Sequence, residues 1–130
     1  MTRAKGPTAS QRRLVADRAG YRCEVCGRVL ALAPDAERPD WVQAHSFHHR
    51  QPRGMGGSTA PGRHAAYQLL LVCGSGTTGC HGLIESQRAL AYSHGWLVKH
   101  PIDPATVPVT VYGHFHPVLL TTDGDYQVAA

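Results

Sequence analysis

Four cysteines form two pairs whose spacing suits a metal site. Cys23 and Cys26 form a C-x2-C pair in a tight turn, where Gly27 permits a left-handed backbone conformation. Cys73 and Cys80 form a looser C-x6-C pair that looks like a cysteine turn enlarged by a flexible, glycine-rich insertion. Four thiolates from two such turns suit a closed, tetrahedral, structural zinc site. A disulfide and unpaired thiols are the alternatives.

A second group of candidate residues combines histidines with a carboxylate. His48 and His49 are adjacent on a predicted strand, so they point to opposite faces, and one can bind a metal while the other acts on a neighbouring group. Histidine is also the usual general base near neutral pH. His81 and Glu85 lie four residues apart on a predicted helix, the spacing with which one helix face holds a cation. The alternatives are a solvated strand end and a helix start with an exposed His and Glu.

Two helices are predicted from capping signals and apolar periodicity. The first is expected over 8–19, because Thr8 and Gln11 match a capping box and Gly20 is placed to end the helix. The second is expected from 80 to 93, closed by Gly95. The second helix would carry His81 and Glu85 on one face.

Short strands and turns are predicted for most of the remaining chain. A loop rich in Gly, Ser and Pro is expected at 52–62, directly after the histidine pair. Asp123 and Gly124 indicate a turn near the C-terminus. Apolar runs of strand length predict strands at 29–32, 42–49, 67–72, 107–112, 117–120 and 126–128.

Composition excludes several classes of protein. The 130 residues favour one domain, and 42% apolar with 17% charged residues is typical of a globular chain rather than a disordered one. No segment approaches the roughly 18 apolar residues of a membrane-spanning helix. The first residues carry charge without an apolar run behind them, unlike a signal peptide. We therefore expect an intracellular, cytoplasmic protein, in which metal binding by cysteine is favoured over disulfides.

The charge balance indicates a nucleic-acid partner. Thirteen basic against nine acidic residues give a net charge of +4, and eleven of the thirteen are Arg, which forms two-pronged hydrogen bonds to phosphate. A coding bias toward Arg is the alternative. On the first helix, Arg12, Arg13 and Arg18 lie away from the apolar positions, where a solvated face is the default and a phosphate-binding face the alternative.

Together these motifs resemble those of the HNH endonucleases. The segment 48–50 (HHR), the apolar strand 69–73 and the helix start with His81 and Glu85 follow the order of that family. The segments HHRQPRGMGGS from residue 48 and LLLVCGSGTTGCHG from residue 69 most resemble the corresponding segments of small HNH proteins of bacteriophages that infect actinobacteria. The resemblance covers roughly residues 20–125.

The resemblance implies a fold and a division of the chain. The fold would be α+β, with a ββα-metal (His-Me finger, treble-clef-like) core held by the four-cysteine zinc. A single domain over 1–130 would consist of a basic N-terminal helix at 1–20, the zinc-held core at 21–95 and a C-terminal extension of short β-strands at 96–130.

The resemblance also implies roles for individual residues. His49 matches the general base that activates the attacking water, and His48 and His81 match ligands of one catalytic divalent metal (Mg²⁺, Mn²⁺, Ni²⁺ or Zn²⁺). Glu85 falls where many members have a third His; a carboxylate there suits Mg²⁺ or Mn²⁺. The DNA phosphates would be bound by Arg50, Arg53 and Arg88.

The implied activity is hydrolysis of phosphodiester bonds in double-stranded DNA, by nicking or double-strand cutting, leaving 5′-phosphate and 3′-hydroxyl ends. The resemblance further implies phage genome processing in the host-cell cytoplasm, alongside the terminase that packages DNA, and no membrane partner.

One position departs from the family pattern. The chain contains no Asn, and Gln68 stands where the Asn of HNH precedes the apolar strand. Gln keeps the amide on one more methylene, so it can hold the base-bearing loop from a shifted backbone. The alternative is a zinc-stabilised nucleic-acid-binding module with weak or lost nuclease activity. His45 shares a strand face with His49, where it could orient that base or lie near the substrate; the alternative is a partly exposed histidine without a role. His64 has no partner at metal spacing in the sequence.

Overall fold

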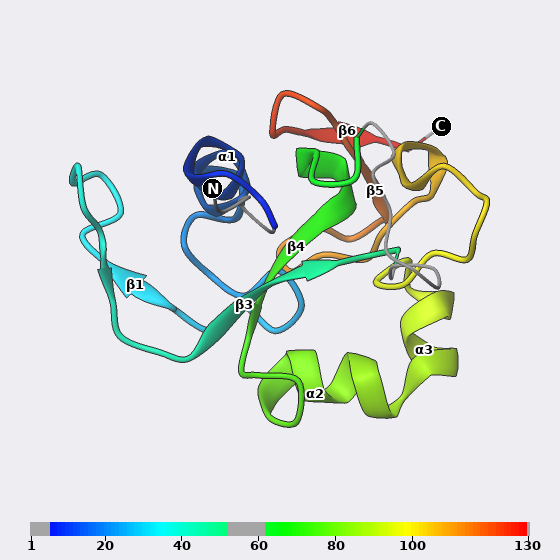
Figure 1. Ribbon diagram of the computed structural model, residues 1–130, viewed down its shortest axis with the longest axis horizontal. Helices are drawn as coiled ribbons and strands as arrows, with labels where there is room; N and C mark the ends of the chain where they lie inside the picture. Colours follow the sequence, from blue (N-terminus) through cyan, green and yellow to red (C-terminus); the bar gives the residue numbers. More distant parts are fainter. Residues whose placement is uncertain (1–5, 52–61, 130) are drawn as a thin grey trace, which may run out of the picture.

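The computed structural model describes residues 6–51 and 62–129 and combines helices with small antiparallel sheets (Figure 1). This mixture agrees with the predicted α+β class. In chain order the elements are α1 (Ala9–Ala19), β1 (Ala31–Leu32), β2 (Asp40–Trp41), β3 (His45–His49), the 3-10 helix η1 (Ala66–Gln68), β4 (Leu69–Cys73), α2 (Gly79–Ser86), α3 (Arg88–Ser93), the 3-10 helix η2 (Pro104–Thr106), β5 (Val118–Leu120) and β6 (Tyr126–Val128).

Helix α1 begins and ends where the sequence predicts. The Thr8 hydroxyl accepts a hydrogen bond from the Gln11 N–H (3.1 Å), and the Gln11 side chain accepts one from the Thr8 N–H (2.8 Å). Gly20 then adopts the left-handed conformation, with φ of 64°, and ends the helix. Both ends are therefore fixed by residues next to the helix in sequence.

The antiparallel hairpin of β3 and β4 lies at the centre of the structure. Its register pairs His45 with Cys73 and His49 with Leu69. Every residue of β4 is buried, because α1 and α2 both pack against this strand (Figure 1). The hairpin therefore brings the histidine segment next to the second cysteine pair.

The predicted helix over 80–93 is broken into two. At Gln87 the backbone leaves the helical region, with φ of −116° and ψ of 63°, so that α3 turns away from α2 (Figure 1). The Gln87 N–H still donates to Leu83 and its carbonyl accepts from Ala91, so the bend leaves these backbone groups hydrogen-bonded. Both Ile84 in α2 and Ala91 in α3 remain fully buried on the two sides of the bend.

Other predicted strands are shorter than expected. Of the range 29–32, only Ala31–Leu32 forms a strand, while Val29 makes an isolated bridge with Arg22. The partner strand of Ala31–Leu32, Asp40–Trp41, lies before the predicted 42–49 strand. The predicted 107–112 strand is wrong: Val109 forms only an isolated bridge with Val118. Strands β5 and β6 agree with the prediction and are joined by a turn in which Gly124 has φ of 82°.

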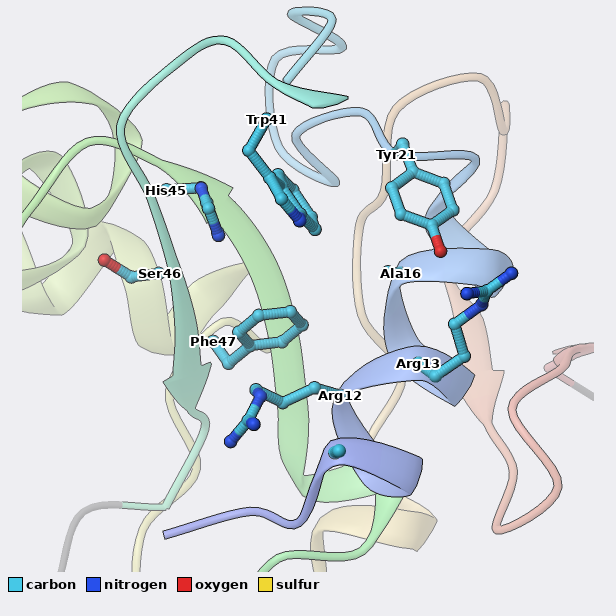
Figure 2. Close-up of a pocket in the computed structure, with 9 residues that line it drawn as sticks. Arg12, Arg13, Ala16, Tyr21, Trp41, His45, Ser46 and Phe47 are labelled. Carbon is cyan, nitrogen blue, oxygen red and sulfur yellow. The ribbon is translucent and has the colours of Figure 1, made fainter. Parts of the chain in front are cut away.

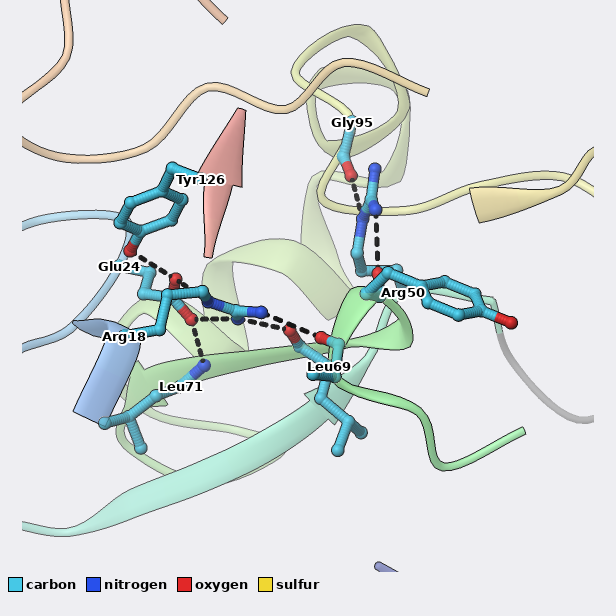
Figure 3. Close-up of polar contacts among 9 residues, drawn as sticks. Arg18, Glu24, Arg50, Leu69, Leu71, Gly95 and Tyr126 are labelled. Atoms are coloured by element: carbon cyan, nitrogen blue, oxygen red, sulfur yellow. Dashed lines mark hydrogen bonds and ion pairs between the residues drawn. The ribbon is translucent and has the colours of Figure 1, made fainter. Parts of the chain in front are cut away.

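A buried ion pair links three parts of the fold (Figure 3). Arg18 from α1 and Glu24 form a two-pronged pair (2.7 and 3.0 Å), with both side chains about 1% exposed. The Glu24 carboxylate also accepts hydrogen bonds from the Leu71 N–H of β4 (2.8 Å) and the Tyr126 hydroxyl of β6 (2.6 Å). Since its oxygens have partners on several elements, the buried charge is well compensated.

In the part of the chain that the structure describes, every helix is too short or too polar to cross a membrane.

Candidate metal centres

The four cysteines come together at one point, as the sequence predicts. The sulfur atoms of Cys23, Cys26, Cys73 and Cys80 lie within 4.8 Å of one another, and all four are free thiols. The first pair lies in a turn closed by the hydrogen bond from the Gly27 N–H to the Cys23 carbonyl (2.9 Å). Cys73 ends β4 and Cys80 lies in the first turn of α2. This donor set fits a zinc ion.

The six residues between Cys73 and Cys80 form a compact turn rather than an open insertion. Thr78 accepts a hydrogen bond from the Ser75 N–H (2.9 Å), and the Cys80 N–H points to the Cys73 sulfur (3.3 Å). Gly74 has a φ of 89°, and a Cβ there would collide with the Thr78 carbonyl. The wider spacing therefore still delivers both sulfurs to one site.

The electrostatics of the cluster favour a bound cation. Burial raises the pKa of Cys23 and, much further, the pKa of Cys80, where the nearby Cys23 sulfur adds to the effect. At Cys26 burial acts in the same direction, but hydrogen bonds from the Arg28 backbone and the neighbouring thiols lower the pKa overall. Closely spaced thiolates repel one another, and a zinc ion removes that repulsion.

A second potential metal-binding group lies between β3 and α2. Ligand atoms of His48, His81 and Glu85 lie within 4.8 Å of one another. The imidazole rings of His48 and His81 have centroids 5.3 Å apart, and Nε2 of His81 lies 3.9 Å from the Glu85 carboxylate. The hairpin thus brings His48 next to His81 and Glu85, which lie four residues apart on α2.

His48 is prepared to act as a metal ligand. Its Nε2 lies 2.8 Å from the Trp96 carbonyl, so Nε2 carries the proton and Nδ1 keeps its lone pair. Burial lowers the pKa of His48 to about 4, and the ring is neutral at pH 7.

His81 has an atom that a metal would satisfy. Burial lowers the pKa of His81, against the opposing effect of Glu85. Among the described residues, its Nδ1 is buried without a hydrogen-bond partner. A buried nitrogen with a lone pair and no donor nearby is costly unless something binds it.

His49 contacts a residue that the sequence did not indicate. Its Nε2 lies 2.8 Å from Nδ1 of His64, and the two rings meet edge to face with centroids 5.0 Å apart. The shared hydrogen bond restrains the orientation of the His49 ring. His64 lies fifteen residues away beyond the predicted loop, and no local pattern connects the two.

Gln68 holds the backbone that follows His49. Its side-chain oxygen accepts a hydrogen bond from the Gln51 N–H (2.7 Å), and its carbonyl accepts one from the Arg50 N–H (2.7 Å). Gln68 lies at the end of η1, directly before β4, and is buried. The longer side chain therefore anchors the segment that follows His49.

The prediction that Arg50 binds phosphate is wrong. The side chain is 0% exposed, and its guanidinium donates four hydrogen bonds, of 2.8 to 3.0 Å, to backbone carbonyls. Figure 3 shows the one to Gly95. The accepting residues are Tyr67, Gly95, Pro104 and Val107. Arg50 therefore links the segment 95–107 to the hairpin, and none of its N–H groups is exposed to solvent.

The remaining candidates have different surroundings. Arg88 is exposed beside Glu85 (3.3 Å), at the rim of the second cluster, and Arg53 lies outside the described residues. His45 stacks on Trp41 with ring centroids 3.8 Å apart. The side chain that shares a hydrogen bond of 2.8 Å with His49 is that of His64.

Comparison with protein-family models, with curated proteins and with solved structures finds no match for the chain.

Proposed function

We propose that this protein is a metal-dependent DNA endonuclease of the HNH type, with a ββα-metal core formed by β3, β4 and α2. The observation that carries the proposal is the convergence of His48, His81 and Glu85 within 4.8 Å, at the strand that also bears His49. The order of these residues along the chain is the order that the HNH resemblance implies. The four-cysteine cluster would hold a structural zinc beside this core.

In the proposed reaction, His48, His81 and Glu85 would hold a divalent cation, which would supply Lewis-acid stabilisation to the scissile phosphate and the departing 3′ oxygen. His49 accepts a proton from the attacking water, whose oxygen forms a bond to phosphorus as the bond to the 3′ oxygen breaks. The departing 3′ oxygen takes a proton from solvent, so the products are 5′-phosphate and 3′-hydroxyl ends. Gln68 and His64 keep His49 aimed at the water.

The anchoring of Gln68 supports the enzyme over the binding-module alternative. The amide that replaces the family's Asn is hydrogen-bonded to the backbone two residues after His49, the segment that an Asn would have to hold. The net charge of +4 suits double-stranded DNA as substrate. The resemblance to small phage HNH proteins extends the proposal to phage genome processing alongside a terminase.

The test is nicking of supercoiled plasmid at low salt by zinc-loaded protein, with Mg²⁺, Mn²⁺ or Ni²⁺ added in turn. We expect metal-dependent nicking that is lost in His49→Ala and kept in His116→Ala, which changes an exposed histidine of the C-terminal segment. Equal nicking by wild type and His49→Ala would contradict the assigned base. If neither protein nicks while both shift DNA in a gel, the chain is a binding module.

A further inference from the structure

A pocket of about 400 Å³ lies between α1 and the segment that contains β2 and β3 (Figure 2). We call it the aromatic pocket and define it by Arg12, Arg13, Tyr21, Trp41, His45 and Phe47. The proposed hydrolysis uses none of these residues. Figure 2 shows the rings of Trp41 and Phe47 facing the opening, with Arg12 and Arg13 extending from the helix.

The rings of Tyr21, Trp41 and Phe47 belong to or pack against the hydrophobic core and also line the pocket. Trp41 and His45 stack with an interplanar angle of 17°, Phe47 meets Trp41 edge-on at 6.3 Å, and Tyr21 lies 5.4 Å from Trp41. Trp41, His45 and Phe47 are each only partly buried. A partly exposed indole beside further rings is the kind of surface on which a planar ligand stacks.

The pocket also carries positive charge at its rim. Arg12 and Arg13 are exposed on α1, and one Arg12 N–H donates to the Pro7 carbonyl (2.6 Å). Arg13 is paired with Asp17 (3.2 Å), the one carboxylate that these two guanidiniums contact among the described residues. Two guanidiniums against one exposed carboxylate leave a net positive charge that suits a phosphate.

The position of the pocket connects it to the proposed active site. His45, Phe47 and His49 are every second residue of β3 and therefore share one face of the strand. Four residues of strand span about 13 Å, the length of about four nucleotides at ~3.4 Å each. A DNA strand held at His49 can therefore reach the pocket with a neighbouring nucleotide.

We propose that the aromatic pocket binds an unpaired nucleotide of the substrate strand, with its base stacked on Trp41 and its phosphate at Arg12 and Arg13. A base inside a duplex is stacked between its neighbours and cannot lie against a side chain, so among double-stranded DNAs the preferred substrate is one with unpaired nucleotides near the cut. That the bound nucleotide belongs to the substrate rests on the proposed function. The binding site itself rests only on the residues of the pocket.

The test uses the fluorescence of Trp41 in His49→Ala protein, so that no cleavage interferes. The second tryptophan, Trp96, is 7% exposed, and its contribution to the fluorescence is measured in Trp41→Leu protein. We expect an eight-residue oligothymidylate to quench the fluorescence to saturation and to bind more tightly than a blunt duplex of the same length. Duplex binding that is equal or tighter, with equal quenching, would overturn the proposal.

Two variants separate the aromatic and the charged parts of the site. Trp41→Leu should weaken oligothymidylate binding, measured by anisotropy of a labelled oligonucleotide, about 5- to 150-fold, the effect of losing one stacked base. The matched control is Phe115→Leu, which removes a fully exposed ring elsewhere and should leave the affinity unchanged. Arg12→Ala keeps the rings and should lower the slope of log affinity against log salt by about 0.7. Unchanged affinity in both pocket variants would overturn the site.

The two proposals fail in different ways. Nicking that needs His49, without quenching of Trp41, would overturn the pocket alone. Saturable quenching together with nicking that does not need His49 would overturn the assigned base and support the pocket as a nucleic-acid site.

Discussion

Replacing Arg50 by Met should destabilise the fold rather than weaken DNA contacts directly. The guanidinium donates four hydrogen bonds to backbone carbonyls in a site with 0% exposure. Hydrogen bonds from a charged group contribute ~1.5–3 kcal/mol each, so four contribute about 6 kcal/mol at the lower end. Burial opposes this gain, because it lowers the pKa of Arg50 to about 10, which corresponds to a cost of about 3 kcal/mol.

The difference predicts that Arg50→Met lowers the free energy of unfolding by about 3 kcal/mol, before any cost from backbone carbonyls that are left without donors. For a chain of this size, that lowers Tm by roughly 10 °C. Arg50→Lys keeps the charge but concentrates three donors at one atom, so it should lie between Met and wild type.

The assay is thermal unfolding of zinc-loaded protein followed by circular dichroism, with a DNA gel shift well below Tm. Arg88→Met is the matched control, since Arg88 is an exposed arginine with one weak ion pair, and its Tm should stay within about 2 °C. An Arg50→Met protein with wild-type Tm and greatly reduced DNA binding would refute the structural role and restore the phosphate contact.

Three further predictions follow from the metal centres. A chelator that strips the cysteine cluster should unfold the domain, since structural zinc contributes ~10–16 kcal/mol in small metal-folded domains; native circular dichroism at zero bound zinc would contradict this. The pKa of His48 is lowered to about 4, so the neutral ring contributes its full stability above pH ~6.5, and about 3 kcal/mol of the free energy of unfolding is lost as the pH falls through 4. Denaturant unfolding at a series of pH values should show this loss in wild type. It should be absent in His48→Gln, which keeps a hydrogen-bond donor for the Trp96 carbonyl. His64→Ala should slow nicking ~10- to 100-fold without changing DNA affinity, and His64→Asn, whose amide can take the place of Nδ1, should restore most of the rate; equal rates in both variants would argue against a positioning role.

The parts of the fold that could be predicted are those with local signals. Thr8, Gln11 and Gly20 lie next to the helix that they delimit, and the unbroken apolar run of β4 marks a buried strand. The two cysteine pairs, and His81 with Glu85, could likewise be predicted because the residues of each pair lie close together in sequence. Such patterns hold because the groups that make them are neighbours before the chain folds.

The parts that could not be predicted depend on tertiary contacts. An arginine is exposed in most proteins, and Arg50 is buried only because carbonyls from residues 67, 95, 104 and 107 converge on it. The contact of His49 with His64 spans fifteen residues without a repeating pattern. The bend at Gln87 lies in a segment without the Gly or Pro that usually ends a helix, so the sequence does not predict it.

The carboxylate of Glu24 joins the two ends of the chain through the cysteine turn. It lies between two cysteines of the cluster and receives hydrogen bonds from Arg18 near one end and from Tyr126 near the other. Neither end can detach without leaving a buried charge short of a partner. In native-state hydrogen exchange, α1 and the β5–β6 hairpin should therefore open as one cooperative unit, and a truncation before residue 126 should loosen the N-terminal helix that lies a hundred residues away in sequence.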